Sequence, residues 1–421
     1  MKERLRLIPA DDARRILLDG AVTVGTEEVP LREAVGRILA APLRAPHDLP
    51  RYRLSAMDGY AARAGDLAAA TEASPARLRV VGAVPAGGTF DGEVRDGEAV
   101  GIATGGVLPA GADAIVMVEL TASADAAAAA DAYVPVGGDV LVKRAVPAGG
   151  NVVEAGEDIQ SGVTLLSVGR RVRSGDLAAL AAFGVVSVPV FRRPRIAVLA
   201  TGSELCPADA TPRPGQVRES NSSVLGAEVE STGCIAVHGG VVADDAGLLR
   251  ATITRLLADA DGLILSGGSS VGPRDLTGIV LAGLAPGVLF HGIDIRPGKP
   301  TVFARAGHKP VVGMPGYPTS SMIVFEAFVR PLLGRMAGDA ETDPWPQALP
   351  ARLATPYSKP SGREDYLRVR LQTREGATWA EPLPGGSAAI SNVIFADGLA
   401  RMPAGVDTFE AGATIAVRRL S

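Results

Sequence analysis

The residues best suited to chemistry lie in the stretch DGLILSGGSSVGPRD, residues 261–275. A short apolar run there predicts a buried parallel strand, which is followed by a loop rich in glycine and serine. Gly267 and Gly268 permit backbone angles that are closed to other residues, so successive amides can turn toward one point. Asp275 ends the loop with a carboxylate. This set suits an anionic ligand with a metal ion at the carboxylate, although an ordinary tight turn explains the stretch taken alone. Hydroxyls are offered by Ser269 and Ser270.

Further loops after predicted strands carry groups that suit the same ligand. Ligands of open parallel sheets bind beyond the carboxyl ends of the strands. TGSE ends in Glu204, and MPGYPTSS begins a helix whose free amides attract anions. RPGKP places Arg296 and Lys299 near the same rim. Singly, Glu204 could be a surface ion pair and RPGKP a solvated turn. Together the loops predict recognition of a phosphate or an oxyanion with a divalent cation.

The elements that must position these groups fall into several domains, because 421 residues exceed one typical core. Apolar spacing predicts helices over 5–19 and 30–41. We expect residues 1–41 plus 145–185 to form an N-terminal or linker domain. Short β-rich runs separated by Gly and Pro turns predict a β-rich inserted domain over 42–144.

Strands and helices alternate over 186–338, which predicts a parallel sheet in a three-layer α/β domain. In this region, Asp244 is either a ligand-facing acid or the N-cap of the helix that follows it. Residues 346–421 hold short β runs typical of a small C-terminal barrel or sandwich. The fold class is therefore multidomain, α/β plus β.

Composition argues against several classes of protein. The net charge of −4 and an aromatic content of 4% give no support for nucleic-acid binding. Neither a membrane-spanning apolar run nor a signal peptide is visible, so we expect a cytoplasmic protein with no membrane partner. Cys206 and Cys234 form no CxxC pair and are expected to be buried thiols. The four histidines are scattered, which argues against a zinc cluster.

Motifs in a fixed order resemble the molybdopterin molybdenumtransferase family, the gephyrin E-domain type. They are SAMDGYA, ATGGVLPAGADAIVMVE, GEDIQSG, TGSEL, SGGSSVG, RPGKP, MPGYP and GREDYLRVRL, and they span almost the whole chain. The resemblance implies an elongated homodimer of four-part protomers whose α/β domain binds molybdopterin. It also implies insertion of molybdate into adenylylated molybdopterin, with Mg²⁺-assisted release of AMP, and a molybdopterin adenylyltransferase is a possible partner.

The resemblance also assigns roles to single positions. Asp58 and Thr104 match acidic and TG-turn positions that would reach the other protomer's α/β domain. Glu204, Asp244 and Asp275 match acids around the ligand, where carboxylates suit Mg²⁺. The matched positions that would hold the pterin, phosphate or molybdate, or shape the turns around them, are Gly267, Gly268, Ser269, Ser270, Arg296, Lys299, Pro315, Pro318 and Ser387.

Several positions depart from the family's usual pattern, and they cluster at the predicted rim. Ser203 stands where Asp is usual, Ser269 replaces Val, and Tyr317 replaces Asn. Arg296 replaces Lys, which exchanges a point charge for a planar fork. The departures leave open a non-catalytic molybdopterin-binding paralogue and a tungstate-preferring insertase. A bare adenylyltransferase or nucleotide amidase is disfavoured, because it needs neither SAMDGY nor the C-terminal motif.

Overall fold

The computed structural model describes residues 6–125, 133–268, 276–341, 345, 348–359 and 362–420. The chain forms two compact units. One comprises Pro42–Ser167, and the other comprises Met1–Ala41 together with Val168–Ser421. The segment 145–185, which we expected to join residues 1–41 in one domain, is divided between the two units.

The smaller unit is built on a six-stranded sheet with the order β7-β4-β6-β5-β9-β8. The β-rich runs expected over 42–144 supply the strands of this sheet. Tyr60 and Ala62 face one hydrophobic cluster and Ala61 faces another, so the sheet has a core on both sides. The strands are β4 (Gly59–Ala62), β5 (Ala76–Val84), β6 (Glu98–Ile102), β7 (Ala114–Met117), β8 (Thr121–Ser123) and β9 (Asp139–Val142), and a short helix, α2 (Ala64–Leu67), follows β4.

Two short ladders complete the smaller unit, and each joins a segment before the sheet to one after it. β10 (Val152–Val153) pairs with β3 (Leu54–Ser55), and β11 (Thr164–Leu166) pairs with β2 (Leu43–Arg44). Both ladders are antiparallel.

A third ladder, in the larger unit, joins β1 (Thr26–Pro30) to β12 (Ser187–Phe191), with α3 (Ser174–Ala182) close by. The prediction of a helix over 30–41 is wrong. Only a 3₁₀ turn, η1 (Leu31–Glu33), forms there, and Gly36 adopts a φ of +80°. Ile38 and Leu39 instead make strand-like bridges to residues 171 and 190. Their spacing suited a helix, but the chain buries them by pairing with a distant segment.

The predicted N-terminal helix is present as α1 (Ala10–Leu18). Ala10, Ala13 and Leu17 are buried in a core cluster that also contains Phe328 of the α/β domain and Tyr366 of the C-terminal barrel. The first helix of the chain therefore packs against two later domains.

The α/β domain contains a six-stranded sheet with the order β16-β13-β17-β21-β20-β18. The expectation of a wholly parallel sheet is correct for the pairings among the first four strands only, since β20 pairs antiparallel with both β21 and β18. The two-residue connection between β20 and β21 permits only an antiparallel hairpin. The strands are β13 (Arg195–Thr201), β16 (Ile235–Val242), β17 (Gly262–Ser266), β18 (Pro286–His291), β20 (Val302–Ala306) and β21 (Lys309–Met314).

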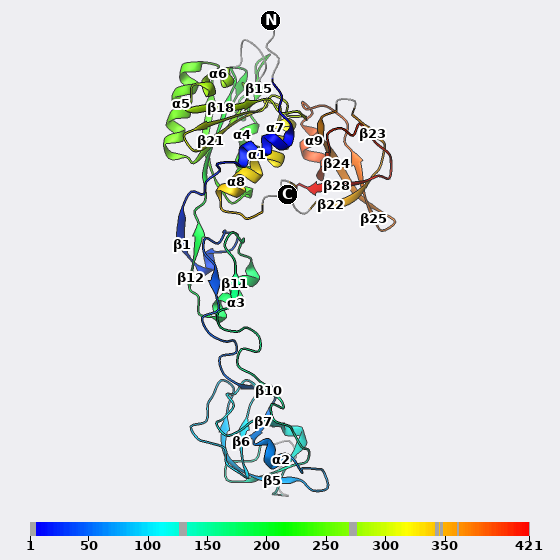
Figure 1. The fold of residues 1–421 in the computed structure, drawn as a ribbon. Helices are drawn as coiled ribbons and strands as arrows, with labels where there is room; N and C mark the ends of the chain where they lie inside the picture. Colours follow the sequence, from blue (N-terminus) through cyan, green and yellow to red (C-terminus); the bar gives the residue numbers. More distant parts are fainter. Residues whose placement is uncertain are drawn as a thin grey trace. The chain divides into compact units, whose positions relative to one another are not determined.

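Helices cover both faces of this sheet, which gives the three layers that the sequence predicted (Figure 1). Ile196 and Val198 of β13 face one helical layer, whereas Ala197 and Leu199 face the other. The first layer contains α1, α4 (Asn221–Ser231), α7 (Pro318–Val324), the π-helix η3 (Phe325–Val329) and α8 (Arg330–Met336), and the second contains α5 (Ala246–Asp259) and α6 (Leu276–Ala282).

The C-terminal domain is a barrel of five strands, β24-β25-β22-β28-β26, closed by pairing between β24 and β26. A sixth strand, β19 (Ile295–Arg296), comes from the α/β domain and pairs with the start of β24. The barrel lies beside the α/β domain, and α9 (Ser391–Phe395) contacts α7 (Figure 1). The barrel strands are β22 (Leu349–Leu353), β24 (Glu364–Arg374), β25 (Ala377–Pro382), β26 (Gly398–Met402) and β28 (Thr414–Arg419), and a small ladder joins β23 (Tyr357–Ser358) to β27 (Thr408–Phe409).

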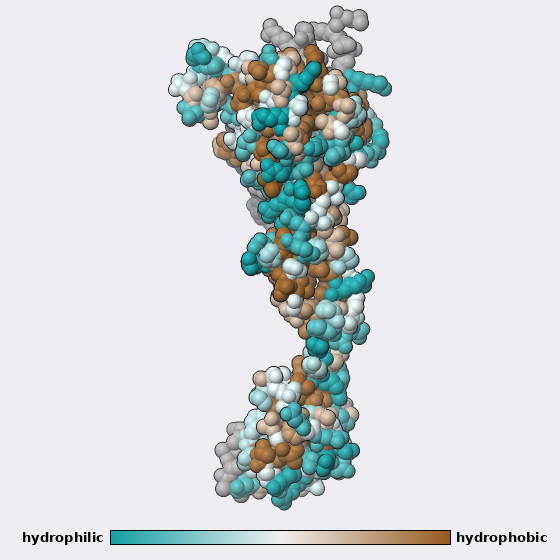
Figure 2. Space-filling model, turned by 90° about the vertical axis from the view of Figure 1, so that its left-hand side faces the viewer, coloured by the Kyte–Doolittle hydropathy of each residue, from teal (hydrophilic) through white to brown (hydrophobic). Residues whose placement is uncertain are grey.

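Hydrophilic and hydrophobic residues are interspersed over the face shown in Figure 2. Within the described part of the chain, no helix combines the length and apolar character needed to cross a membrane. Cys206 and Cys234 are both buried free thiols, as expected.

Candidate functional site

A cavity of about 800 Å³ lies between the α/β domain and the barrel. The RPGKP and PGYP turns line one side of it, and the start of β24 and the loop around Ser387 line the other. Four predicted binding residues therefore meet here: Arg296, Lys299, Pro315 and Ser387.

Asp365 is the buried acid of this cavity, and only 3% of its side chain is exposed. The Tyr357 hydroxyl donates a hydrogen bond to Asp365 at 2.8 Å, and Arg296 Nε lies 3.8 Å from the same carboxylate oxygen. Burial and the hydrogen bond to Asp365 raise the pKa of Tyr357 to about 12. Tyr357 therefore stays a neutral donor at physiological pH, while Asp365 serves as a counter-ion for Arg296.

Arg368 supplies a buried guanidinium at the same cavity, and the residue is 8% exposed. One of its terminal nitrogens donates to the Gly385 carbonyl at 2.8 Å. Its Nε is buried and has no hydrogen-bond partner among the described residues. A buried donor without a partner is costly, so a bound anion is a natural acceptor for this N–H. Burial lowers the pKa of Arg368, although the neighbouring Asp365 opposes that shift.

Sequence reasoning did not assign Arg368, Asp365 or Tyr357 to the site. Arg368 and Asp365 lie inside GREDYLRVRL, which was used only to recognise the family. The sequence did contain a signal for these residues, because charged residues alternate with apolar ones in this predicted strand. Charged side chains are seldom buried without a partner, so buried ones indicate a site or an ion pair. Arg363, from the same motif, also lines the cavity and forms an ion pair with Asp294 at 3.0 Å.

The loops predicted to share the carboxyl edge of the sheet do meet there. Asn221, the first residue of α4, donates to Ser266 Oγ at 2.7 Å and to the Gly316 carbonyl at 2.8 Å. Gly267 has a φ of +94°, and a Cβ at that position would lie 2.2 Å from the carbonyl oxygen of Thr201. The backbone after β17 therefore approaches the end of β13 too closely for any side chain.

Gly268 is constrained in the same way as its neighbour. It has a φ of +63°, and a Cβ there would lie 2.4 Å from the hydroxyl oxygen of Thr277. Both glycines of the predicted anion loop are thus required by the backbone geometry. The remaining predicted members of that loop, Ser269, Ser270 and Asp275, lie outside the described residues.

The loop after β13 is tied to Asp244 in both directions. Ser203 N donates to Asp244 Oδ2 at 3.1 Å, and Asp244 N donates to Ser203 Oγ at 3.1 Å. The N-cap of α5 is Asp245, whose carboxylate accepts a hydrogen bond from Leu248 N at 2.7 Å. Asp244 is thus not the helix cap, and its carboxylate faces the predicted ligand edge.

Glu204 is exposed in the same loop, and its carboxylate folds back over Gly202. A Cβ on Gly202 would lie 2.8 Å from either oxygen of that carboxylate. Glu204 and Asp244 are oxygen ligands of the type that Mg²⁺ prefers, so the donor chemistry fits this ion. The described residues contain no group of three or more His, Cys, Asp or Glu side chains that could hold a metal, and the third predicted ligand, Asp275, lies outside them.

Pro315 and Pro318 shape the turn before α7. Pro318 occupies the first turn of the helix, where a proline costs no hydrogen bond. The Pro315 carbonyl accepts a hydrogen bond from the Ser321 hydroxyl. Thr319 then donates to the Ala389 carbonyl at 3.1 Å, which links this helix to the loop that carries Ser387.

Asp58 and Thr104 lie together in the smaller unit. Thr104 donates to Asp58 Oδ1 twice, from its backbone N at 2.7 Å and from its hydroxyl at 3.1 Å. Both residues are exposed. The pair therefore presents one carboxylate, held by two hydrogen bonds, on the surface of this unit.

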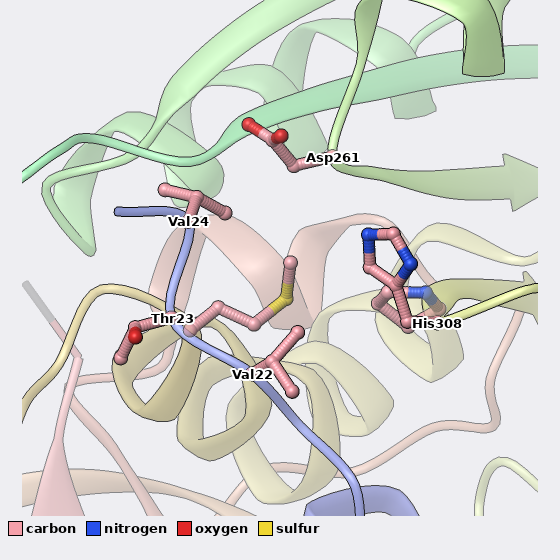
Figure 3. Close-up of a pocket in the computed structure, with 7 residues that line it drawn as sticks. Val22, Thr23, Val24, Asp261 and His308 are labelled. Carbon is pink, nitrogen blue, oxygen red and sulfur yellow. The ribbon is translucent and has the colours of Figure 1, made fainter.

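A smaller cavity of about 190 Å³ lies elsewhere on the α/β domain (Figure 3). Asp261 and His308, which line it, directly precede β17 and β21. These are the amino ends of parallel strands, opposite the edge where ligands of such sheets bind. The Asp261 carboxylate already accepts a hydrogen bond from Arg195 N at 2.8 Å. The larger cavity is therefore the better candidate.

Comparisons with known proteins match the chain along nearly its whole length. The MoeA N-terminal region (domain I and II) matches residues 8–184, a "Probable molybdopterin binding domain" matches 197–335, and the MoeA C-terminal region (domain IV) matches 350–420. A molybdopterin molybdenumtransferase of Bacillus subtilis is 32% identical over 99% of this chain and 95% of its own. One from Synechococcus elongatus is 35% identical over 94% of each chain.

A solved structure of a molybdopterin biosynthesis moeA protein from Pyrococcus horikoshii has 34% sequence identity and a TM-score of 0.85. The alignment covers 98% of this chain and 99% of that one. The domain order, the multidomain α/β and barrel fold, and the sequence matches all agree. The chain belongs to the molybdopterin molybdenumtransferase family.

Proposed function

We propose that the protein is a transferase of molybdenum cofactor biosynthesis that inserts molybdate into the dithiolene of adenylylated molybdopterin and releases AMP. Two points support this proposal. The family relationship covers 99% of the chain, and the cavity between the α/β domain and the barrel gathers cationic groups suited to an oxyanion.

The observation that carries the proposal is the convergence of Arg296, Lys299 and Arg368 on one cavity. Lys299 lines the cavity, and the buried Arg368 Nε has no acceptor among the described residues. Ser387 adds a hydroxyl from the opposite wall. Molybdate, a tetrahedral dianion, would accept hydrogen bonds from these donors while the pterin occupies the remaining volume.

Mg²⁺ belongs to the proposal as the ion bound by Glu204, Asp244 and Asp275. When bound, it would offset the negative charge of the phosphoanhydride that is cleaved. Asp244 is held in place by Ser203, and the close approach of Gly267 to Thr201 brings the β17 loop to the same edge. These residues therefore orient the adenylylated end of the substrate.

The remaining parts of the proposal concern assembly and supply. We propose a homodimer in the cytoplasm, in which Asp58 and Thr104 of one protomer complete the α/β site of its partner. The exposed, hydrogen-bonded carboxylate of Asp58 supports this role, because an exposed acid held in one geometry suits recognition better than folding. An adenylyltransferase would supply the adenylylated pterin.

The test is an insertion assay with purified protein, adenylylated molybdopterin, molybdate and Mg²⁺. We expect stoichiometric AMP release only when Mg²⁺ and the oxyanion are both present, and active cofactor as the product. Absence of AMP release at saturating substrate would refute the proposal. The same assay with molybdate and tungstate in competition decides which oxyanion is preferred.

The second candidate is a molybdopterin-binding paralogue without turnover, and Ser203 is the observation that favours it. A serine there removes one carboxylate from the edge that would hold the metal. This candidate predicts tight pterin binding with no AMP release, and gain of AMP release in Ser203→Asp.

A further inference from the structure

A buried charged cluster joins α1 to the barrel. Arg14 donates hydrogen bonds to the carboxylate of Glu364 and to the hydroxyl of Tyr366, which itself donates to Glu364. Arg401 donates two more bonds to Glu364 Oε2, at 3.0 and 2.8 Å. The side chains of Arg14 and Glu364 are only 9% and 5% exposed. In this buried setting Glu364 thus accepts hydrogen bonds from three side chains, those of Arg14, Tyr366 and Arg401.

Glu364 and Asp365 are consecutive residues of β24, and successive side chains of a strand point to opposite faces. Glu364 points toward Arg14 of α1, whereas Asp365 points into the cavity, where it contacts Tyr357 and Arg296. The same two residues pair with β19, in the register Ile295 to Glu364 and Arg296 to Asp365. One short segment of backbone therefore carries the cluster on one face and the oxyanion-binding wall on the other.

We infer that Glu364 is a positioning residue for oxyanion binding, and that α1 sets the geometry of the cavity through Arg14. By fixing the start of β24, the cluster fixes Asp365, and Asp365 in turn holds the guanidinium of Arg296. The inference rests on the proposed function, because it assumes that the cavity binds an oxyanion. It deepens that proposal by adding residues that touch neither the cavity nor the substrate.

The electrostatics of the cluster agree with this role. Burial alone would raise the pKa of Glu364, but Arg14, Tyr366 and Arg401 outweigh burial and lower it. Glu364 is therefore ionised and fully hydrogen-bonded. Buried ion pairs contribute little net stability compared with apolar packing, so a role in specifying geometry accounts for the cluster better than stability does.

A second buried ion pair between the α/β domain and the barrel serves as a control. It shows what the loss of such a pair does to stability when the pair lies away from the cavity. Arg418 of the barrel contacts Glu326 of the π-helix at 2.9 Å, and the Glu326 side chain is 3% exposed. This pair also joins the barrel to the α/β domain, but neither residue lines the cavity or belongs to β24.

The experiment measures molybdate binding by calorimetry and thermal unfolding for the full-length wild type, Glu364→Gln and Glu326→Gln. We expect Glu364→Gln to raise the molybdate Kd roughly tenfold, the usual effect of removing a residue that orients a ligand-binding group. In the insertion assay, Glu364→Gln should raise KM for molybdate and leave kcat nearly unchanged. Glu326→Gln should lower the Tm as much or more while leaving the molybdate Kd unchanged.

If Glu364→Gln does not fold, Arg401→Met replaces it, because the Arg401 side chain is 31% exposed and its loss is better tolerated. An unchanged Kd in the tested variant, or an equal rise in Glu326→Gln, would overturn the inference. Failure of the wild type to bind molybdate would instead refute the proposed function, so the two failures are distinguishable.

Discussion

Ser203 and Asp244 hold each other through two hydrogen bonds of 3.1 Å, one in each direction between backbone N–H and side-chain oxygen. The pair joins the loop after β13 to the loop before α5, where two of the proposed magnesium ligands lie. The family resemblance implies an aspartate at the position of Ser203, and that aspartate would add a carboxylate. In this chain the serine instead accepts a hydrogen bond from Asp244 N. The Asp244 carboxylate is oriented at both oxygens, since Ser203 N donates to Oδ2 and the Thr201 hydroxyl lies 3.5 Å from Oδ1.

We therefore expect Ser203→Ala to weaken Mg²⁺ binding clearly while changing the free energy of unfolding only slightly. Loss of the hydroxyl removes the bond that Asp244 N donates and keeps the one from the backbone N of residue 203, which loosens the Asp244 loop. The Mg²⁺ concentration for half-maximal AMP release should therefore rise roughly tenfold. The free energy of unfolding should change by less than about 0.5 kcal/mol, because both residues are exposed. Thr254→Ala, which removes an exposed hydroxyl from α5, is the control. An unchanged Mg²⁺ requirement in Ser203→Ala would contradict this role.

Gly267→Ala should destabilise the protein by roughly 1–3 kcal/mol, since the residue has a positive φ and no space for a Cβ. The new methyl group would lie against the Thr201 carbonyl and push apart the two loops that form the ligand edge. Urea unfolding measures the effect. Gly334→Ala, in α8, meets only an ordinary contact at 3.7 Å and should be neutral or slightly stabilising. Equal stability of the two variants would show that the loop at Gly267 can move enough to accommodate a Cβ atom.

Local patterns were sufficient to predict most of the fold. The strand at 263 and the helix at 246–259 were predictable because their apolar residues follow one period and their ends carry turn formers or caps. The helix expected over 30–41 failed because Ile38 and Leu39 pair with residues more than a hundred positions away. The reversal of β20 was missed, although the short connection from β20 to β21 already excludes a parallel crossover.

Prediction of the site was limited in the same way. Arg296, Lys299 and Ser387 could be named because they occupy turns that match the family. Asp365 and Arg368 were missed because they lie inside a strand, and only the fold reveals that β19 joins this strand to the α/β domain. The contact between Arg14 and Glu364 joins residues 350 positions apart, so no local pattern could indicate it.

Lys299→Ala should weaken oxyanion binding and leave folding nearly unchanged. A lysine on a turn contributes little to stability, but in a cavity it supplies a full positive charge. We expect a clear rise in the molybdate Kd, measured by calorimetry, with a change in Tm no larger than that of Lys143→Ala in the smaller unit. Parallel losses of stability and of binding would count against a role in the site.

The pH dependence of stability should report Glu228, a half-buried acid beside the buried carboxylate of Glu326. Burial, and then the nearby Glu326 carboxylate, raise the pKa of Glu228 from 4.5 to about 7, despite Arg330 and Arg418 close by. The folded state therefore binds this proton more tightly than the unfolded state. The resulting stabilisation is fully present below pH 4.5 and is lost as the pH rises through about 7.

Glu228→Gln should remove this contribution, because glutamine does not titrate. The fall in the free energy of unfolding between pH 5 and pH 8, measured with urea, should then be smaller in the variant than in the wild type. Glu230→Gln, on the exposed side of the same helix, is the control and should behave like the wild type. A pH dependence in Glu228→Gln identical to that of the wild type would exclude the proton uptake assigned to Glu228.

Mixing two inactive variants tests whether Asp58 acts in the site of a partner protomer. Asp58→Ala and Lys299→Ala should each lose most of the insertion activity, because each removes one half of the proposed composite site. If the site is shared across a homodimer, unfolding and refolding the two together produces mixed dimers with one intact site. Random pairing then restores about a quarter of the wild-type activity.

The controls for this experiment are each variant refolded alone, which should stay inactive, and sedimentation to confirm the dimer. Thr104→Val refines the result, since it removes the 3.1 Å hydroxyl bond to Asp58 and keeps the 2.7 Å backbone bond. Its activity should lie between those of the wild type and Asp58→Ala. If the mixed variants form dimers but regain no activity, then no dimer contains an intact composite site. That result would place Asp58 outside the partner's site.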